Sequence, residues 1–337
     1  MFKIAIHGFG RIGKLVTRRL FDVGLGENLT LINEQNGSIE NLATLLEFDS
    51  IHGHWPKDIE ISTNTIKINS HEITVLNSSS IAGLKQVISS VDLLIDCTGS
   101  TKNFNVLKKY LDCGVKSVLV SAPVNDDRIL NIVYGVNHSL YDSSKNHVVT
   151  AASCTTNCLA PIVKVLNEQI GIKHGSITTI HNVTNSQTIV DKPAGNIRRS
   201  RSALNSLFPS TTGSASAISL IFPELKGKLN GHAVRVPVLN ASLTDCVFEM
   251  KTKITADEIN ELFEDASNNE LSGILGCEKR ELVSADYVNN PLSTIIDASS
   301  TMVINETQLK IYAWYDNEWG YTCRMVDIAN LIKKNYE

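Results

Sequence analysis

The 337-residue chain has no C-x-x-C pair, although it contains seven cysteines. An odd number of scattered cysteines does not fit a disulfide framework, and a zinc site is not expected without cysteines at ligand spacing. No apolar run approaches the length of a membrane span, and Met1 leads directly into FKIAIHGFG, which is not a signal peptide. We therefore expect a reduced, cytoplasmic protein that holds no metal and contacts no membrane.

The sequence also lacks a strong charge of either sign. Its formal net charge of −4 provides no electrostatic footprint for nucleic acid or for an anionic membrane. There is no internal repeat, low-complexity segment or obvious flexible linker. The length is sufficient for two domains, each with a core of its own.

The first half of the chain alternates short apolar strands with helical patterns. FKIAI precedes the helix candidate RIGKLVTRRLFDV, LTLIN precedes SIENLATLLEF, VDLLIDC precedes TKNFNVLKKYLDCG, and KSVLVSA completes the series. This alternation implies right-handed crossovers and a parallel sheet. Between these elements, DIEISTNTIKINSHEITVL alternates with period two around NS, which predicts antiparallel hairpins added to the parallel core.

The second half has a different pattern. A helix candidate begins near Cys154, and the strand candidates GSITTIHNV, GHAVRVPV and ASLTDCVFEM are longer and less regularly separated by helices. This favours an α+β domain with a largely antiparallel sheet. The final stretch WGYTCRMVDIANLIKKNYE has helical spacing and could return to pack on the first domain. The fold class is therefore α/β, with a Rossmann-type domain followed by an α+β domain.

The stretch IHGFGRIG fits G-x-G-x-x-G with Gly8, Gly10 and Gly13. A strand precedes it, a helix begins near Arg11, and Glu34 ends the next strand at the spacing of a ribose contact. The helix N-terminus would face the phosphates of a dinucleotide. A carboxylate near the 2′-hydroxyl favours NAD over NADP. A plain glycine turn is the alternative.

The stretch VVTAASCTTNCLAP places Cys154 at the start of a helix. Ser153 is a plausible N-cap, and a helix N-terminus or a neighbouring imidazole lowers the pKa of a thiol. Thr155 adds a hydroxyl that could help to receive an oxyanion, Cys158 is interpreted as a buried structural thiol, and Pro161 predicts an irregular first turn. The pattern leaves two interpretations of Cys154 open, a nucleophile and an ordinary buried thiol.

A base and anion-binding residues are less well defined by pattern. His181 ends the strand GSITTI and is either a general base or a surface loop residue. Arg235 lies within an apolar strand, where a lone arginine needs an anionic or polar partner. The stretch PSTTGSA offers hydroxyl and backbone N–H groups between Ser210 and Gly213. A cluster of arginines, either an anion site or a solvated face, comprises Arg198, Arg199 and Arg201.

The blocks HGFGRIG, AASCTTNCLAP, PSTTGSA, PELKGKLNGHAVRVP and WYDNEWGY make the chain similar to the phosphorylating glyceraldehyde-3-phosphate dehydrogenases. The resemblance runs from end to end and in order. It implies an NAD-binding Rossmann domain at 1–153, completed by a C-terminal helix at 318–337, with a catalytic domain at 154–317. It also implies a homotetramer.

The resemblance implies a reaction for two residues. In the family, the cysteine that matches Cys154 attacks an aldehyde, and the histidine that matches His181 accepts its proton and stabilises the oxyanion. Hydride then passes to the nicotinamide of NAD and leaves a thioester, which inorganic phosphate attacks to release an acyl phosphate. The implied substrates are glyceraldehyde 3-phosphate and phosphate.

The resemblance also implies binding residues. One anion site matches Ser153, Thr155, Thr212 and Gly213, and the other matches Thr184, Arg201 and Arg235. Cofactor contacts beyond the glycines match Arg11, Ile12, Glu34, Thr98, Ser121 and Asn317, the last of which holds the nicotinamide carboxamide in the family.

The chain departs from the family pattern at several positions. His7 stands where the family has asparagine, Glu34 replaces an aspartate, and HNVTNSQTIVDKPAGN differs from the common loop. LLEFDSIHGHW and LNASLTDCVFE resemble the branch that accompanies arsenical efflux carriers, which suggests arsenate as the oxyanion and a role in arsenic resistance.

Three alternatives remain open. Erythrose-4-phosphate dehydrogenase is disfavoured by the intact STTG, and aspartate-semialdehyde dehydrogenase by its absent motifs. A non-catalytic NAD-binding or RNA-binding regulator is disfavoured by the retained Cys154, His181 and Arg235.

Overall fold

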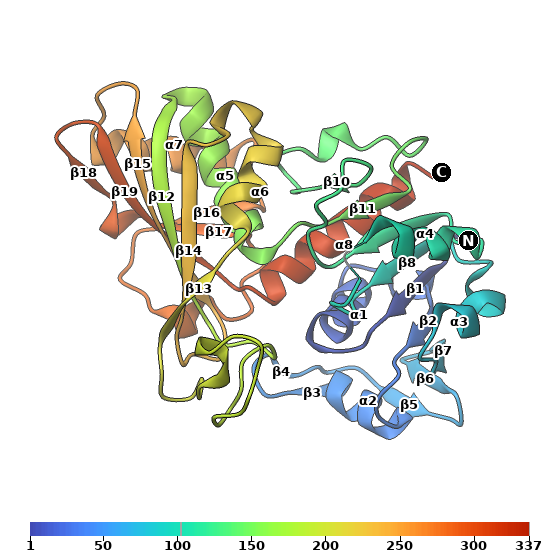
Figure 1. Ribbon diagram of the computed structural model, residues 1–337. Coiled ribbons are helices and arrows are strands. Elements are labelled where there is room, and N and C mark those ends of the chain that lie inside the picture. The colour runs from blue at the N-terminus through green and yellow to red at the C-terminus, as the bar shows by residue number, and fades with distance from the viewer. Residues whose placement is uncertain (102, 337) are drawn as a thin grey trace. The chain divides into compact units, whose positions relative to one another are not determined.

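The computed structural model describes residues 1–101 and 103–336, so Lys102 and Glu337, which fall in the predicted helices at 101–114 and 318–337, lie outside it. The chain forms two compact units: residues 1–153 with 322–337, and residues 154–321 (Figure 1). Across the described residues, no helix combines the length and the hydropathy that a membrane span requires.

The described part of residues 1–153 contains four α-helices and eleven strands, and the end of helix α8 (Trp319–Lys334) completes the first unit. Its helices are α1 (Arg11–Asp22), α2 (Ile39–Glu47), α3 (Ile81–Ile88) and α4 (Phe104–Asp112). Its strands are β1 (Ile4–His7), β2 (Leu29–Asn33), β3 (Phe48–Asp49), β4 (Gly53–His54), β5 (Ile59–Ile61), β6 (Thr65–Ile68), β7 (His71–Leu76), β8 (Leu93–Asp96), β9 (Ser117–Val120), β10 (Leu130–Asn131) and β11 (Val148–Thr150).

The large sheet of this unit has the order β10-β11-β9-β8-β1-β2-β7-β6-β5. All neighbours are parallel except β5 with β6 and β6 with β7, which form the predicted antiparallel hairpins. The order reverses at β1, which lies between β2 and β8, and such a switch point is where open α/β sheets bind ligands. The predicted parallel Rossmann sheet is confirmed.

Strand β1 shows why these segments read as continuous apolar runs. Ile4, Ala5 and Ile6 are each no more than 1 % exposed, so both faces of the strand are covered. Helix α3, between β7 and β8, was not predicted. It is only eight residues long and has Gly83 in its first turn, where the Ser80 side chain accepts a hydrogen bond from the Gly83 backbone N–H.

The second unit contains helices α5 (Cys154–Gln169), α6 (Ser214–Ile221) and α7 (Ala256–Asn268). Its strands are β12 (Ile172–His181), β13 (Phe208–Thr211), β14 (Leu229–Arg235), β15 (Ser242–Met250), β16 (Leu275–Glu278), β17 (Thr294–Asp297), β18 (Met302–Ile304) and β19 (Gln308–Tyr315). Helix α8 (Trp319–Lys334) begins in this unit and ends in the first.

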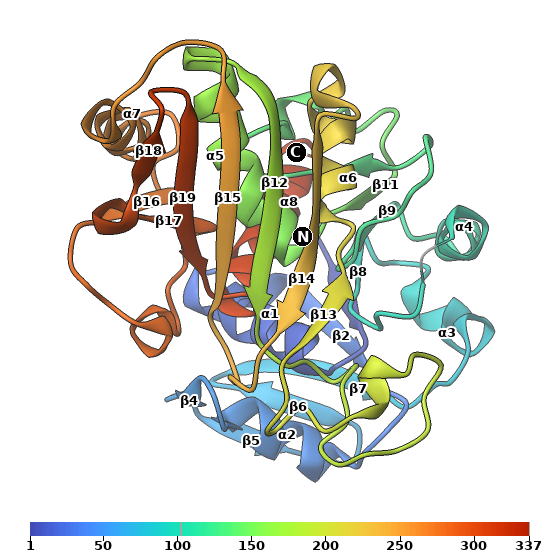
Figure 2. The same ribbon diagram turned by 60° about the vertical axis from the view of Figure 1, so that its left-hand side comes forward.

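The sheet of the second unit has the order β13-β14-β12-β15-β19-β17-β16, with β18 paired to β19 (Figure 2). It is mostly antiparallel, as expected, but β12 with β14 and β16 with β17 are parallel pairs. One end of this sheet gathers the ends of β12 and β14, where His181 pairs with Arg235, and the junction of β15 and β19, where Ser242 pairs with Tyr315.

Helix α5 packs on this sheet against β12, β15, β17 and β19. The irregular first turn predicted from Pro161 is wrong, because α5 is helical from Cys154 to Gln169 with the proline inside it. Pro161 cannot donate to the carbonyl of Asn157, yet the helix continues, since its packing outweighs one missing backbone hydrogen bond. Just before the helix, Ala152 has a left-handed backbone with φ 52°.

Candidate active site

The thiol of Cys154 lies beside the imidazole of His181. Cys154 is the first residue of α5, His181 is the last residue of β12, and their Sγ and Nε2 atoms are 3.7 Å apart. Residues 27 positions apart therefore meet because the helix begins where the strand ends. This is hydrogen-bonding distance for sulfur, and it is the geometry of a nucleophile and its base.

The other ring nitrogen of His181 is held by a carbonyl group. Nδ1 lies 2.9 Å from the Asn182 carbonyl oxygen, and the Nη1 atom of Arg235 lies 2.9 Å from the same oxygen and 2.7 Å from Nδ1. Two neutral tautomers of His181 fit these contacts. With its proton on Nε2, the ring accepts at Nδ1 from Arg235; with its proton on Nδ1, it donates to the carbonyl and leaves Nε2 free to accept the thiol proton, as a general base requires.

Burial shifts the pKa of both reacting groups. It lowers the pKa of His181 to about 4, and the positive charge of Arg235 acts in the same direction. Burial raises the pKa of Cys154, against the opposing effects of the Thr155 hydroxyl and of Arg235. The position of Cys154 at a helix N-terminus predicted a lowered thiol pKa, but burial has the larger effect. At neutral pH the resting pair is therefore a thiol beside a neutral imidazole.

A buried network of hydroxyl groups lies next to Cys154 and His181. The Tyr315 hydroxyl lies 2.9 Å from Thr155 Oγ1 and 2.8 Å from Thr179 Oγ1. The Tyr315 ring stands edge-on to the His181 ring, with centroids 6.2 Å apart. Sequence reasoning missed Tyr315 and Thr179, although Tyr315 lies within the quoted WYDNEWGY block. Their separation in sequence from Cys154 gave no spacing signal.

Arg235, which contacts His181, lies near a second arginine, Arg199. The Nε atom of Arg235 is buried and has no hydrogen-bond partner in the part of the chain that the structure describes. The side chain of Arg199 reaches two hydroxyls, Ser186 Oγ and Ser210 Oγ, each at 3.3 Å. Arg199 is also close enough to lower the pKa of Arg235, although burial is the larger cause of that shift. Two cations thus lie near one another, with donors to spare for an anion.

Two residues predicted for this anion site lie differently. Arg201 is exposed and forms an ion pair with Asp191 at 2.6 Å. Thr184 is also exposed, and its hydroxyl donates to the Gln187 side chain at 3.1 Å. Sequence reasoning grouped all three arginines of this cluster and could not tell that Arg199, and not Arg201, turns toward Arg235.

The second predicted anion site lies at two helix N-termini. Ser153 precedes α5, and Gly213 is the N-cap of α6, which packs on α5. The Thr212 hydroxyl donates to Ser214 Oγ at 3.1 Å and accepts from the Ser214 backbone N–H at 3.3 Å. Backbone N–H groups at helix N-termini and nearby hydroxyls are ready donors to a tetrahedral oxyanion.

The glycines of the first unit build an anion-binding turn. Gly8 has φ 90°, and a Cβ there would lie 2.7 Å from the backbone of Cys97 and of Thr98. A Cβ on Gly13 would lie 2.0 Å from the Gly8 carbonyl oxygen, so strand and helix approach each other closely. Gly10 is the N-cap of α1 and has open space around it. This space at a helix N-terminus fits a pyrophosphate.

The carboxylate of Glu34 is tied to this turn. Its Oε2 accepts from the Phe9 backbone N–H at 2.7 Å, and its Oε1 accepts from the Asn36 backbone N–H at 3.0 Å.

On the neighbouring strand β8, Asp96 binds two other residues predicted to contact the cofactor, Thr98 and Ser121. Its side chain accepts from the Thr98 hydroxyl at 2.7 Å, and its carbonyl accepts from the Ser121 backbone N–H at 2.9 Å.

The first turn of α1 carries a buried ion cluster that sequence reasoning missed. Asp49 pairs with Arg11 and with Lys14, the latter at 2.6 Å, while Ile12 between them is half-buried. Although burial acts to raise it, hydrogen bonds from both cations hold the pKa of Asp49 well below its usual range. The residue could have been noted in the quoted LLEFDSIHGHW block, but an isolated aspartate has no spacing signal.

Comparison with known proteins decides the family. Residues 2–104 match the model of the glyceraldehyde 3-phosphate dehydrogenase NAD binding domain, and residues 153–317 match that of its C-terminal domain. The chain is similar to glyceraldehyde-3-phosphate dehydrogenase 3 of Nostoc sp., with 51 % identity over 331 residues and 98 % of each chain covered. It is 44 % identical to glyceraldehyde-3-phosphate dehydrogenase 1 of Bacillus cereus and 42 % identical to the Geobacillus stearothermophilus enzyme, again over 98 % of each chain. The chain belongs to the glyceraldehyde-3-phosphate dehydrogenase family.

Membership of the glyceraldehyde-3-phosphate dehydrogenase family confirms the resemblance seen in the sequence, the class of NAD-dependent oxidoreductase and the cofactor. The glycine turn belongs to its NAD-binding domain, and the residues present fit the cofactor. The open N-terminus of α1 at Gly10 accommodates a pyrophosphate, and the Glu34 carboxylate stands beside the turn. In the family domain that contains Cys154, Asn317 is 6 % exposed, and its Oδ1 accepts from the Ser242 hydroxyl at 3.2 Å.

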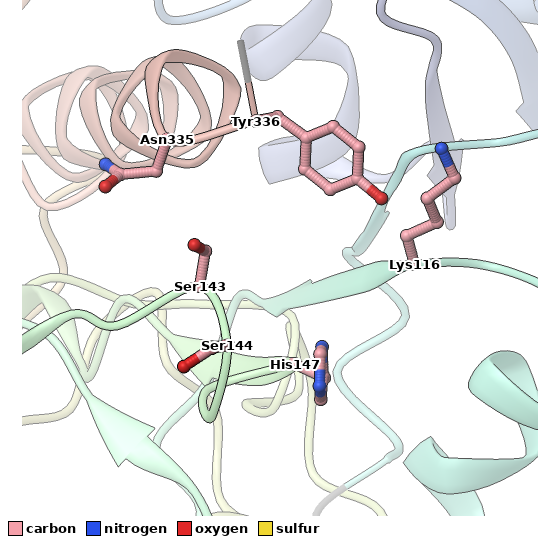
Figure 3. A pocket seen from close by; sticks show the side chains of 6 residues that line it. All are labelled: Lys116, Ser143, Ser144, His147, Asn335 and Tyr336. Atoms are coloured by element: carbon pink, nitrogen blue, oxygen red, sulfur yellow. The ribbon is translucent and has the colours of Figure 1, made fainter.

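A pocket of about 490 Å³ lies elsewhere in the first unit of this dehydrogenase. Figure 3 shows Asn335 and Tyr336 on one side of it and the Ser143–Ser144 turn with His147 on the other, with Lys116 at the edge. Lys116 is already paired with Asp92 at 2.8 Å. None of the predicted site residues lines this pocket, so it is separate from the chemistry.

Proposed function

We propose that the protein oxidises and phosphorylates glyceraldehyde 3-phosphate, with NAD as the hydride acceptor and Cys154 as the nucleophile. The observation that carries this proposal is the 3.7 Å approach of Cys154 Sγ to His181 Nε2, with Nδ1 held at the Asn182 carbonyl. The family to which the chain belongs supports the substrate. An erythrose 4-phosphate dehydrogenase is the second candidate, and it uses the same pair.

The reaction follows from the resting state of this pair. As the Cys154 sulfur bonds to the aldehyde carbon, its proton passes to His181 Nε2, and the carbonyl oxygen becomes an oxyanion beside the imidazolium. Bound NAD would supply the hydride acceptor for this carbon, and Cys154 would then hold the substrate as a thioester. An oxygen of inorganic phosphate then attacks the thioester carbonyl. The acyl phosphate leaves as the carbon–sulfur bond breaks, and the thiolate regains its proton from the His181 imidazolium.

The phosphate group of the substrate is assigned to Arg235 and Arg199. The buried Nε of Arg235 has no partner within the described residues, and Arg199 is held toward it by Ser186 and Ser210. Arg201 is the matched control, because it is exposed and already paired with Asp191. Arg199→Ala should raise KM for glyceraldehyde 3-phosphate more than Arg201→Ala does.

The attacking oxyanion is assigned to Ser153, Thr155, Thr212 and Gly213. Hydroxyl and backbone N–H groups recognise a tetrahedral anion by shape and charge. Phosphate and arsenate share both properties, so we propose that arsenate also serves, giving the unstable 1-arseno-3-phosphoglycerate. The proposed role in arsenic resistance rests on the resemblance of LLEFDSIHGHW and LNASLTDCVFE to the branch that accompanies arsenical efflux carriers.

The decisive test is NADH formation, followed by absorbance, with each substrate varied separately. Phosphate-dependent turnover of glyceraldehyde 3-phosphate should exceed that of erythrose 4-phosphate, and the reverse order would favour the second candidate. Turnover with phosphate and none with arsenate would remove the arsenate proposal. Replacing NAD by NADP should lower kcat/KM, because the Glu34 carboxylate repels a 2′-phosphate.

We also propose a homotetramer located in the cytoplasm. Five large apolar side chains of the segment 188–207 are more than half exposed: Ile189, Val190, Ile197, Leu204 and Leu207. Such a concentration of apolar surface supports an interface with another copy.

The proposed location in the cytoplasm has a separate basis. The seven cysteines are all free, which agrees with a reducing compartment.

A further inference from the structure

His7 is the last residue of β1 and lies at the switch point of the parallel sheet. It is paired in register with Asn33 of β2 on one side and with Asp96 of β8 on the other. The residue is half-buried. A titratable ring therefore stands at the carboxyl ends of these strands, where an open α/β sheet binds its ligand.

The amide of Asn33 shows which nitrogen of the His7 ring carries the proton. Its Oδ1 accepts from the Ser78 backbone N–H at 2.9 Å, and its Nδ2 donates to the Ser78 carbonyl at 3.0 Å. Ser78 thus fixes the amide with its nitrogen toward the ring, where Nδ2 lies 2.8 Å from His7 Nδ1. An amide nitrogen can only donate, so Nδ1 accepts and the neutral ring carries its proton on Nε2.

The same amide connects the ring to the loop that follows β7. Asn33 ends β2 and Ser78 follows β7, so the hydrogen bonds between them join two loops at the carboxyl edge of the sheet. Next to Ser78, Asn77 Nδ2 lies 3.5 Å from the carbonyl oxygen of Gly37, in the loop that begins at Glu34. The loop after β7 therefore braces the loop that carries the predicted ribose contact.

A proton on Nδ1 would disrupt this chain of hydrogen bonds. An imidazolium donates from both nitrogens, so Nδ1–H of His7 would face the N–H groups of the Asn33 amide. Turning the amide over would relieve that contact, but it would place the amide oxygen against the Ser78 carbonyl and the amide nitrogen against the Ser78 N–H. In either arrangement the connection between the ring, the amide and the loop is weakened.

The surroundings of the ring keep it neutral. Burial lowers the pKa of His7, while the carboxylates of Asp96 and Glu34 act to raise it. Asp96 already accepts from the Tyr110 hydroxyl of α4 at 3.2 Å, and the Tyr110 ring stands edge-on to His7. The titratable groups that face the ring thus come from β8, α4 and the loop after β2. At neutral pH the ring is uncharged, as the Asn33 amide requires.

We propose that His7 is a positioning residue for the dinucleotide, which holds the loop after β7 at the edge of the cofactor site through Asn33, and does so only while its ring is neutral. The protonated ring releases the loop, and the adenosine side of the cofactor then binds more weakly. Cys154 and His181 lie in the other unit, so this dependence on pH belongs to cofactor binding and not to the reacting pair. Because NAD is the cofactor of the family, the role of His7 is the same whichever aldehyde is the substrate.

Binding of ADP-ribose to the full-length protein tests this role, measured by titration calorimetry from about pH 8 to about pH 5, the range in which an ordinary histidine titrates. In the wild type the Kd should rise roughly threefold to tenfold as the pH falls through the lowered pKa of His7, since about one hydrogen bond is lost. His7→Asn is the conservative variant, because asparagine Oδ1 takes the place of Nδ1 as an acceptor and does not titrate. It should bind ADP-ribose like the wild type at the upper pH and lose the dependence on pH.

His7→Leu removes the acceptor, so ADP-ribose should bind roughly threefold to tenfold more weakly over the whole range. Hydrogen exchange of the segment 77–88 should be faster in this variant and close to the wild type in His7→Asn. His54→Asn is the control, since the His54 side chain is 53 % exposed, and its profile should follow the wild type. Parallel pH profiles for wild type and His7→Asn would overturn the proposal, and so would a His7→Leu variant that binds as tightly as the wild type.

Discussion

At the scale of single residues, the reactivity of Cys154 is set by opposing neighbours. Burial raises the pKa of its thiol, while the Thr155 hydroxyl and the guanidinium of Arg235 act to lower it. Arg235 also lowers the pKa of His181, in addition to burial. One arginine thus favours the thiolate and keeps the base neutral, although it touches neither the sulfur nor Nε2.

Replacing Arg235 should therefore shift the titration of the thiol. In Arg235→Gln the pKa of Cys154 should rise, because a positive charge that stabilises the thiolate is gone. The rate of alkylation by iodoacetamide, measured against pH, should reach its midpoint at higher pH than in the wild type. Arg201→Gln is the control, since Arg201 is paired with Asp191. Overlapping profiles for Arg235→Gln and wild type would contradict the assignment.

His181→Asn should slow thiol attack by roughly 10²–10⁴, the usual contribution of a general base. In the wild type, protonation of His181 removes the base, so kcat/KM should fall as the pH drops through the lowered pKa of about 4. An asparagine has no such titration, and the acid limb due to this group should vanish. Stopped-flow measurement of hydride transfer against pH checks both points, and an acid limb near the ordinary histidine value would speak against burial as the cause.

The sequence identified the reacting residues better than it identified the side chains that surround them. Cys154 lies in an intact motif block, His181 stands at the position of the family histidine, and the structure brings the two side chains together. Arg199 and Arg201 were indistinguishable in the sequence, because their orientation depends on Ser186, Ser210 and Asp191 across a folded loop. Tyr315 could not be linked to Thr155, since only the pairing of β15 with β19 and the packing of α5 bring them together.

At the scale of elements, the turn between β1 and α1 depends on close backbone approach. A Cβ at Gly13 would lie 2.0 Å from the Gly8 carbonyl oxygen, whereas a Cβ at Gly10 meets no atom within 4 Å. The two glycines therefore serve different purposes. Gly13 allows the helix to pack on the strand, and Gly10 keeps space clear for a phosphate.

Alanine at these two positions should give different defects. Gly13→Ala should destabilise the protein by about 1–3 kcal/mol, the cost of overpacking, and should weaken NAD binding with it. Gly10→Ala should leave the midpoint of thermal unfolding nearly unchanged and weaken NAD binding alone. Calorimetric unfolding without cofactor, together with NAD titration, checks the pair. Equal loss of stability in both variants would show that the open space at Gly10 is not specific to a ligand.

Element prediction succeeded where periodicity was long and failed where it was short. The parallel strands were evident as apolar runs, and the hairpins around Asn69 as strict alternation. Helix α3 was missed because eight residues with a glycine in the first turn have a weak helical pattern. Pro161 was given too much weight, since local propensity ignores the sheet on which α5 packs.

At the scale of the whole molecule, the exposed apolar side chains of segment 188–207 are the feature that a single chain does not explain. Ile197 is 87 % exposed, although burial of an isoleucine side chain is favourable in free energy. Internal contacts stabilise the segment, among them the ion pair of Asp191 with Arg201. An ordered loop that presents apolar side chains to solvent is typical of an interface.

Ile197→Asp should dissociate the proposed tetramer, because a charge would be buried unpaired at the interface. Light scattering after size exclusion should give a lower mass for this variant. Val283→Asp is a control, since Val283 is 62 % exposed but lies outside the segment. An unchanged mass for Ile197→Asp, with a folded spectrum, would exclude this loop from the interface.

The left-handed backbone of Ala152, two residues before Cys154, has a consequence for how the protein can change. With φ 52°, an L-residue bears a strain of about 1 kcal/mol that glycine would not. Ala152→Gly would therefore raise the midpoint of thermal unfolding, while it would make the turn that positions the Cys154 sulfur more flexible. Selection for thermal stability alone would favour glycine at position 152, whereas selection for catalytic turnover would retain alanine. Stability and activity therefore favour different residues at this position.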